Sequence, residues 1–141
     1  MSRRIGAAAV ISDDRRRVLL VRHTYGERNW ELPGGIGNDG ESADATAVRE
    51  VREETGLEVA AERLTGIYWE PAADMHHFAF VCRRTMRTEA RPDMDENDEV
   101  RWCDRSALPR PISDFTVRRI DDALDGNPAE IHEIGPRQWI R

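Results

Sequence analysis

The feature that most constrains this chain is a strong helix-forming segment that follows a glycine-rich loop. Residues 42–55 are rich in alanine, glutamate and arginine, which all favour helices. Ser42 is a suitable N-cap, and Gly56 stands where helices often end in a left-handed conformation. The preceding loop, residues 33–40, contains four glycines, so its backbone can approach a ligand or a metal ion closely. The sequence therefore predicts a fixed loop–helix unit.

Three acids share one face of this predicted helix. Glu50, Glu53 and Glu54 have the spacing i, i+3 and i+4, which makes them neighbours on the helix surface. Their mutual repulsion needs compensation, and hard divalent cations such as Mg²⁺ prefer oxygen ligands. Arg49 and Arg52 flank the cluster, and one of them could hold a carboxylate in place through a charge-assisted hydrogen bond. The alternative, which is the commoner case for a short motif alone, is a solvated surface helix.

Apolar patterns on both sides of the helix predict β-strands. Residues 5–11 and 18–21 are apolar with a polar run between them, which predicts a two-stranded hairpin. Further strands are expected at residues 29–32, 58–69, 75–84 and 100–103. A second helix is predicted at about residues 113–124, ending near Gly126, because apolar side chains recur there at helical spacing. The mixture indicates an α/β or α+β sandwich.

Length and composition favour one compact domain over residues 1–141. No apolar run is long enough to span a bilayer, and the apolar stretch at residues 6–11 is too short for a signal peptide, so we expect a cytoplasmic protein. The net charge of −6 argues against strong general binding of nucleic acids. Cys82 and Cys103 lack the spacing of a zinc site and are expected to be reduced and partly buried.

Residues 35–57, GIGNDGESADATAVREVREETGL, resemble the Nudix box. That pattern is Gly, then Glu after five residues, and after seven more Arg-Glu, an apolar residue, any residue, Glu-Glu, any residue, Gly and an apolar residue. The specified positions are all filled, by Gly35, Glu41, Arg49-Glu50, Val51, Glu53-Glu54, Gly56 and Leu57. The resemblance extends to residues 29–35 before the box and to residues 96–109 after it.

The resemblance implies a Nudix-type α/β/α sandwich with a mixed β-sheet, in which the box forms a loop–helix–loop. It implies a metal site formed by the Gly35 carbonyl, Glu50, Glu53 and Glu54. It also implies orienting or structural roles for Glu41 and Arg49. The general base differs among members of the family, and the expected catalytic set is Glu53, Glu54, Glu50, Arg49 and Glu96. For Glu96, a solvated acid in the run 93–99 is an equally weighted alternative.

The implied activity is hydrolysis of a pyrophosphate bond with Mg²⁺ as cofactor and Mn²⁺ as a substitute. The expected substrate is a small nucleotide in which a nucleoside diphosphate is linked to another moiety, of the ADP-ribose or nucleotide-sugar type. One alternative is a house-cleaning nucleoside triphosphate pyrophosphohydrolase of MutT type. Another is a catalytically silent Nudix-fold nucleotide-binding module or sensor. Many members of the family are homodimers, and the sequence does not decide the oligomeric state.

Residues that recognise the substrate lie outside the box and are harder to predict. Candidates for stacking on a base, each with core packing as the alternative, are Tyr25, Trp30, Tyr68 and Trp69. Candidates for phosphate contacts are Arg22, Arg28 and Arg83. His76 and His77 are adjacent in a predicted strand and should point to opposite faces. One of them could line the pocket, with surface exposure as the alternative.

Overall fold

The structure, a computed structural model, describes residues 3–141. Its helices are α1 (Ala43–Thr55) and α2 (Asp114–Leu124), with a short 3-10 helix at Pro71–Ala73. Its strands are β1 (Ile5–Ile11), β2 (Val18–His23), β3 (Trp30–Glu31), β4 (Gly34–Ile36), β5 (Val59–Glu70), β6 (Met75–Arg84), β7 (Asn97–Cys103), β8 (Ile112–Ser113), β9 (Ile131–Glu133) and β10 (Trp139–Ile140). This mixture of helices and mixed sheets confirms the expected fold class.

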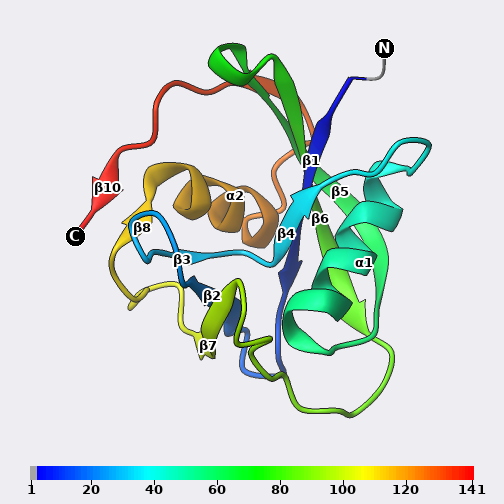
Figure 1. The fold of residues 1–141 in the computed structure, drawn as a ribbon, viewed down its shortest axis with the longest axis vertical. Helices are drawn as coiled ribbons and strands as arrows, with labels where there is room; N and C mark the ends of the chain where they lie inside the picture. Colours follow the sequence, from blue (N-terminus) through cyan, green and yellow to red (C-terminus); the bar gives the residue numbers. More distant parts are fainter. Residues whose placement is uncertain (1–2) are drawn as a thin grey trace.

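The strands form two five-stranded sheets, ordered β4-β1-β6-β5-β9 and β10-β8-β3-β2-β7. In the first sheet β1 runs parallel to β6 and antiparallel to β4. The two helices lie on opposite sides of β1 and β6 (Figure 1), with α1 packed against β1, β4 and β5. The glycine-rich loop and α1 are therefore fixed to the edge of the first sheet through β4.

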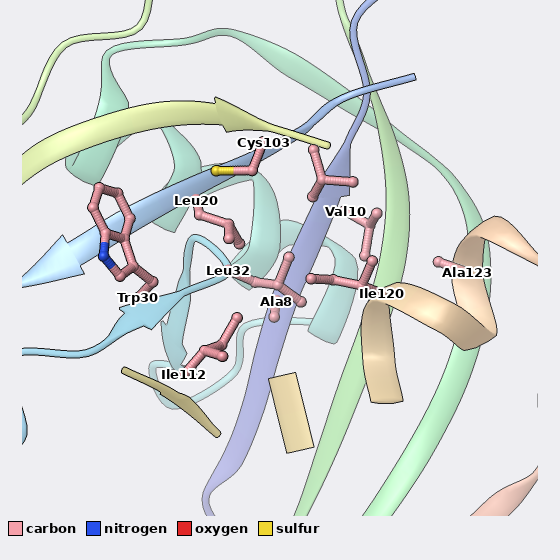
Figure 2. Close-up of a cluster of buried hydrophobic side chains, with 10 residues drawn as sticks. Ala8, Val10, Leu20, Trp30, Leu32, Cys103, Ile112, Ile120 and Ala123 are labelled. Atoms are coloured by element: carbon pink, nitrogen blue, oxygen red, sulfur yellow. The ribbon is translucent and has the colours of Figure 1, made fainter. Parts of the chain in front are cut away.

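Two hydrophobic cores lie on the two faces of β1, because successive side chains of a strand point in opposite directions. Ala8 and Val10 contribute to the core beneath α2, where Ile120 is fully buried (Figure 2). Ala9 and Ile11 contribute to the other core, beneath α1. The remaining buried members of that second core are Leu19, Val51, Leu57, Val59 and Cys82. Burial on both faces makes β1 a central strand.

Helix α1 has the boundaries that its sequence predicts. The Ser42 hydroxyl accepts a hydrogen bond from the Ala45 N–H at 3.4 Å, as an N-cap does. Gly56 ends the helix at φ 75°, and its N–H donates to the Arg52 carbonyl at 2.9 Å. Val51 is fully buried and anchors one side of the helix to the sheet. The opposite side is left for the acids.

The predicted hairpin of the first two strands is wrong. β1 and β2 belong to different sheets and are linked only by an isolated bridge between Ser12 and Val18. The Asp13 carboxylate accepts from the Arg15 and Arg17 N–H groups and folds the polar connection into a turn. After this turn β1 and β2 diverge into different sheets. Each of them has apolar residues on both faces and lies between two other strands of its own sheet.

Several short strands were absent from the expectations. β4 forms within the predicted glycine loop, β7 begins at Asn97 rather than Val100, and β8, β9 and β10 have two or three residues each. Segments this short show no recognisable alternation, and glycine weakens the signal further. Cys82 and Cys103 are free and buried, as expected, and burial raises their pKa to about 12 and about 11. Within residues 3–141, no helix has the length and apolar character needed to cross a membrane.

Ile120→Ala is expected to destabilise the protein by about 3 kcal/mol, because it leaves a cavity in the core beneath α2. Ile131→Ala is the matched control, since Ile131 is 65% exposed while Ile120 is 0% exposed. The control should cost less than about 1 kcal/mol. Urea unfolding measures both free energies. Equal losses in the two variants would contradict the placement of α2 over this core.

Candidate functional site

Arg49 is the centre of a network that joins the loop to the acidic face of α1. Its Nε and Nη2 groups donate to the two carboxylate oxygens of Glu41, at 2.8 and 3.0 Å. Its Nη1 group donates to Glu50 at 2.8 Å and to Glu53 at 3.1 Å. Nη2 also donates to the Ile36 carbonyl at 3.0 Å. One guanidinium therefore fixes three carboxylates and the β4 backbone relative to one another.

Glu41 is the anchor of this network. Hydrogen bonds from Arg49, then from the Thr46 hydroxyl at 2.7 Å and the Asn38 N–H at 3.1 Å, lower the pKa of Glu41 to about 2. The bond to Glu41 likewise raises the pKa of Arg49. Both groups stay ionised across the physiological range. Together they form an ion pair that joins the end of the loop to α1.

Gly35 provides space for Glu50. A Cβ atom on Gly35 would lie 2.6 Å from the Glu50 carboxyl carbon, so any larger residue there would displace that side chain. Gly35 is held in place by β4, where it pairs with Ala7 of β1. Burial raises the pKa of Glu50, although hydrogen bonding to Arg49 opposes the shift. The glycine thus allows a half-buried carboxylate to lie directly against the loop backbone.

Glu54 is the most buried acid of the box, at 4% exposure. One of its oxygens accepts from the Gly34 N–H at 2.7 Å. Burial, with smaller contributions from the negative charges of Glu50, Glu96 and Asp93, raises the pKa of Glu54 to about 9. Without a cation nearby, a pKa of about 9 keeps this carboxyl protonated at neutral pH. A cation bound beside the carboxyl would favour its ionised form instead.

Glu53 and Glu96 complete the acidic group. The Glu53 side chain is exposed and reaches Arg49. Glu96 is exposed and lies near enough for its charge to raise the pKa of both Glu50 and Glu54. Two backbone hydrogen bonds hold its loop, one from the Glu96 N–H to Asp93 and one from the Thr24 N–H to the Glu96 carbonyl, each 3.0 Å. Glu96 is therefore both solvent-exposed and close enough to the box for its charge to act there, and its role as a ligand or base stays a prediction.

The chemistry of these residues fits a hard divalent cation. Among residues 3–141, no three acidic, histidine or cysteine side chains are positioned to enclose a metal ion in the present rotamers. Glu50 and Glu53 are bound by Arg49, and Glu54 is bound by Gly34. The side-chain donors are nevertheless all oxygens, which such a cation prefers, and burial raises the pKa of both Glu50 and Glu54.

A cavity of about 260 Å³ lies against the glycine-rich loop before α1. It shares Gly34 and Gly35 with that loop, and Glu50 packs against Gly35. Its other walls include Tyr25, Glu31, His77, Phe115, Arg119 and Arg137. The cavity therefore borders the loop that carries the acids, and aromatic rings and guanidinium groups form the rest of its wall.

Some of the aromatic and histidine candidates line the cavity, and others are packed away from it. Tyr25 lines the cavity and stacks on His23, with ring centroids 4.6 Å apart. His77 lines the cavity as well, whereas His76 packs against Trp69, so the two histidines take different surroundings as predicted. Trp30 and Tyr68 are buried core residues, which is the alternative that the sequence left open.

The arginines predicted for phosphate contacts are engaged elsewhere. Arg22 and Arg28 both bind Asp98, at 2.9 and 3.0 Å, and Arg83 pairs with Glu62 at 3.5 Å. The cavity arginines are instead Arg119 and Arg137, which sequence reasoning missed. Arg119 follows Phe115 by one helical turn, and this spacing is only a weak indication that the two side chains share a face of α2. Arg137 lies in a tail without a recognisable pattern.

Comparisons with known proteins show the family and the fold of this chain. The NUDIX domain model matches residues 2–124. A MutT-like protein of Streptomyces ambofaciens is 31% identical over 120 residues, which are 85% of this chain and 75% of that protein. An ADP-ribose pyrophosphatase of Mycobacterium tuberculosis is 47% identical over 60 residues, covering 39% of this chain and 29% of that protein. A NUDIX hydrolase crystal structure from Nitrosomonas europaea has a TM-score of 0.81 at 19% identity, covering 96% of this chain and 81% of that one, and shows the fold.

In the metal-free protein, Glu54→Gln is expected to reduce the loss of folding stability at alkaline pH. Because the pKa of Glu54 is raised from 4.5 to about 9, the unfolded chain loses a proton in this window that the folded chain keeps. The contribution of the protonated Glu54 carboxyl to the free energy of unfolding is fully present below about pH 4.5, and it is lost as the pH rises towards 9. Glutamine does not ionise, so the variant should match wild type near pH 5 and exceed it at pH 8.

Urea unfolding in EDTA at several pH values measures this difference. Glu62→Gln, at an exposed position paired with Arg83, is the control and should follow wild type at every pH. Parallel pH profiles for wild type and Glu54→Gln would show that Glu54 ionises normally in the folded protein.

Proposed function

Since the chain belongs to the NUDIX family, we propose that it hydrolyses the pyrophosphate bond of a nucleoside diphosphate linked to another moiety. The relatives and the family match make it a Nudix hydrolase; the substrate class is the proposed part. The observation that carries the proposal is the pair of buried carboxyls Glu50 and Glu54, whose raised pKa values suit a neighbouring cation. They lie beside the loop glycines that border the cavity.

The residues of the box would hold the metal. Glu50, Glu53, Glu54 and the Gly35 carbonyl are the proposed ligands, with Mg²⁺ as the cofactor and Mn²⁺ as its substitute. When bound, such a cation supplies charge neutralisation at the pyrophosphate and makes a water molecule more acidic. Arg49 orients the carboxylates, since it already bonds to Glu50 and Glu53.

The proposed reaction is a hydrolysis in which a water oxygen forms a bond to one phosphorus and the bridging P–O bond breaks. A carboxylate accepts the proton from that water, and the leaving phosphate takes the bridging electrons. Glu53 and Glu96 are the exposed acids beside the box, so they are the candidates for the proton acceptor. Glu54, buried and bound to the loop backbone, is better placed as a ligand.

Substrates of the ADP-ribose or nucleotide-sugar type are proposed first. The 47% identity to an ADP-ribose pyrophosphatase supports them, although it covers only 60 residues. A nucleoside triphosphate is the second candidate, because the MutT-like relative matches over 85% of this chain. A binding module without catalysis is the candidate of another class, and the complete set of box acids argues against it. A cytoplasmic location and a homodimer stay predictions from the sequence.

A substrate panel tests these candidates. The purified protein is incubated with Mg²⁺ or Mn²⁺ and ADP-ribose, nucleotide sugars, dinucleoside polyphosphates or nucleoside triphosphates, and the nucleotide and phosphate products are separated by chromatography. We expect cleavage of at least one nucleoside diphosphate derivative into two phosphorylated products. Release of pyrophosphate from triphosphates alone would favour the second candidate, and no turnover in the whole panel would favour the binding module.

Glu53→Gln and Glu54→Gln are each expected to lower kcat at least about a hundredfold, because each removes a metal ligand or a proton acceptor. Both variants should stay folded, which far-UV circular dichroism checks. Glu62→Gln, at an exposed position on β5 outside the box and paired with Arg83, is the control and should retain wild-type turnover. Near-normal rates in the folded Glu53 and Glu54 variants at saturating Mg²⁺ would refute the assigned roles.

A further inference from the structure

The C-terminal end of α1 is tied to a segment outside the box. The connection from β6 to β7, residues 85–96, passes around this end of the helix (Figure 1). The last carbonyl groups of a helix have no partner within the helix, so they need donors from elsewhere. The Arg91 N–H donates to the Thr55 carbonyl at 2.9 Å, and the Asn97 Nδ2 group donates to the Glu54 carbonyl at 3.0 Å. The helix end that carries the acids is therefore held by this connection.

Asn97 is an unusual residue for a buried position. It is the first residue of β7 and is 0% exposed. Its Nδ2 group bonds to Glu54, but among residues 3–141 its buried Oδ1 atom has no hydrogen-bond partner. A buried acceptor without a partner costs free energy, which offsets much of what the Nδ2 bond contributes. The contact that Asn97 fixes, rather than the net stability that it adds, accounts for an amide at this position.

Asn97 also closes the tight turn that carries Glu96. One carboxylate oxygen of Asp93 accepts from three successive N–H groups, those of residues 95, 96 and 97, at 2.9, 3.0 and 3.0 Å. The Met94 N–H donates to the Asn97 carbonyl at 2.8 Å, and Met94 has a left-handed φ of 67°. Such a backbone is costly for a residue with a side chain and persists only where its surroundings fix it. The turn therefore gives Glu96 a defined backbone position.

The same turn contacts the loop that borders the cavity. The Thr24 N–H donates to the Glu96 carbonyl at 3.0 Å, and the Thr24 hydroxyl donates to the preceding carbonyl at 2.7 Å. Tyr25, the next residue of that loop, lines the cavity. Glu96 is exposed on the turn and is near enough for its charge to raise the pKa of Glu54. The turn is therefore attached to the loop after β2 on one side and, through Asn97, to α1 on the other.

We propose that Asn97 is a positioning residue, whose amide fastens the turn of residues 93–97 to the end of α1 and so keeps Glu96 beside the acids of the box. The amide binds the Glu54 carbonyl, while the Asn97 backbone closes the turn directly after Glu96. Loss of the amide would free this side of the turn, which would stay attached to the loop after β2. The inference rests on the proposed function, in which Glu96 is a candidate proton acceptor beside the cation.

A double-mutant cycle between Asn97 and Glu96 tests this inference. Asn97→Leu keeps the branched shape of the side chain but lacks the amide, and Glu96→Gln removes the carboxylate charge. Two quantities are measured, Mn²⁺ affinity by electron paramagnetic resonance and kcat with a substrate that the protein cleaves. Each single variant should lower the same one of these quantities, or both, about tenfold. Because Asn97 acts through Glu96, adding Asn97→Leu to Glu96→Gln should cost less than about twofold more.

Thr65→Val is the matched control for a purely structural effect. Thr65 is 1% exposed, and its hydroxyl donates to the Ala79 carbonyl at 3.1 Å, so this variant also removes a buried hydrogen bond to the backbone. Urea unfolding in EDTA measures how far each variant is destabilised. Thr65→Val should keep Mn²⁺ affinity and kcat within about twofold of wild type, as expected of an independent site. Losses of Mn²⁺ affinity or kcat as large as those of Asn97→Leu would overturn the inference.

The remaining outcomes are each decisive. Coupling of the two positions in either quantity supports the inference. Equal factors for Asn97→Leu with and without Glu96→Gln, or no effect of Asn97→Leu on either quantity, overturn it. If Asn97→Leu does not fold by circular dichroism, Asn97→Ser, which is smaller and also lacks the amide, replaces it in the cycle with the same expectations.

Mn²⁺ binding separates this inference from the proposed function, because it needs no turnover. If Glu50→Gln/Glu54→Gln weakens Mn²⁺ binding while Asn97→Leu changes neither Mn²⁺ affinity nor kcat, the proposed metal site stands and the inference fails. If the wild type binds Mn²⁺ but cleaves no nucleotide, the cycle in Mn²⁺ affinity decides the inference by itself. If the wild type binds no Mn²⁺, the proposed function and the inference both fail.

Discussion

The bond between Arg49 and Glu41 is the interaction on which the site depends. Its two short hydrogen bonds tie the helix to the end of the glycine loop, and the same guanidinium reaches Glu50, Glu53 and the Ile36 carbonyl. Three carboxylates on one helical face would otherwise repel one another. A single arginine therefore allows these acids to be concentrated where the fold already fixes the loop, through the pairing of β4 with β1.

The cavity lies beside this network and has a different chemistry. It borders the box at Gly34 and Gly35, while Glu54 is buried behind the loop with a raised pKa. Its wall also contains two guanidinium groups, each paired with a carboxylate and each packed on Phe115. The family match covers the box and Arg119, whereas Arg137 comes from a segment outside that match.

The sequence predicted the helix that carries the acids well, because its determinants are local. The Ser42 cap, the Gly56 terminus and the acids of α1 all lie within one contiguous segment, so helical spacing alone groups them. The cavity wall depends instead on contacts between residues far apart in the chain, such as Arg137 with Glu70. No spacing encodes such contacts. The hairpin prediction failed for the same reason, because apolar character does not specify which strands pair across two sheets.

Mn²⁺ binding followed by electron paramagnetic resonance tests the central claim most directly, because it reports cation capture without requiring a substrate. Wild type should bind Mn²⁺, and a Glu50→Gln/Glu54→Gln double variant should bind it at least about tenfold more weakly, since two oxygen ligands lose their charge. Mg²⁺ should displace the bound Mn²⁺. Equal Mn²⁺ affinities in the folded wild type and double variant would show that the acidic face of α1 is a solvated helix surface and no metal site.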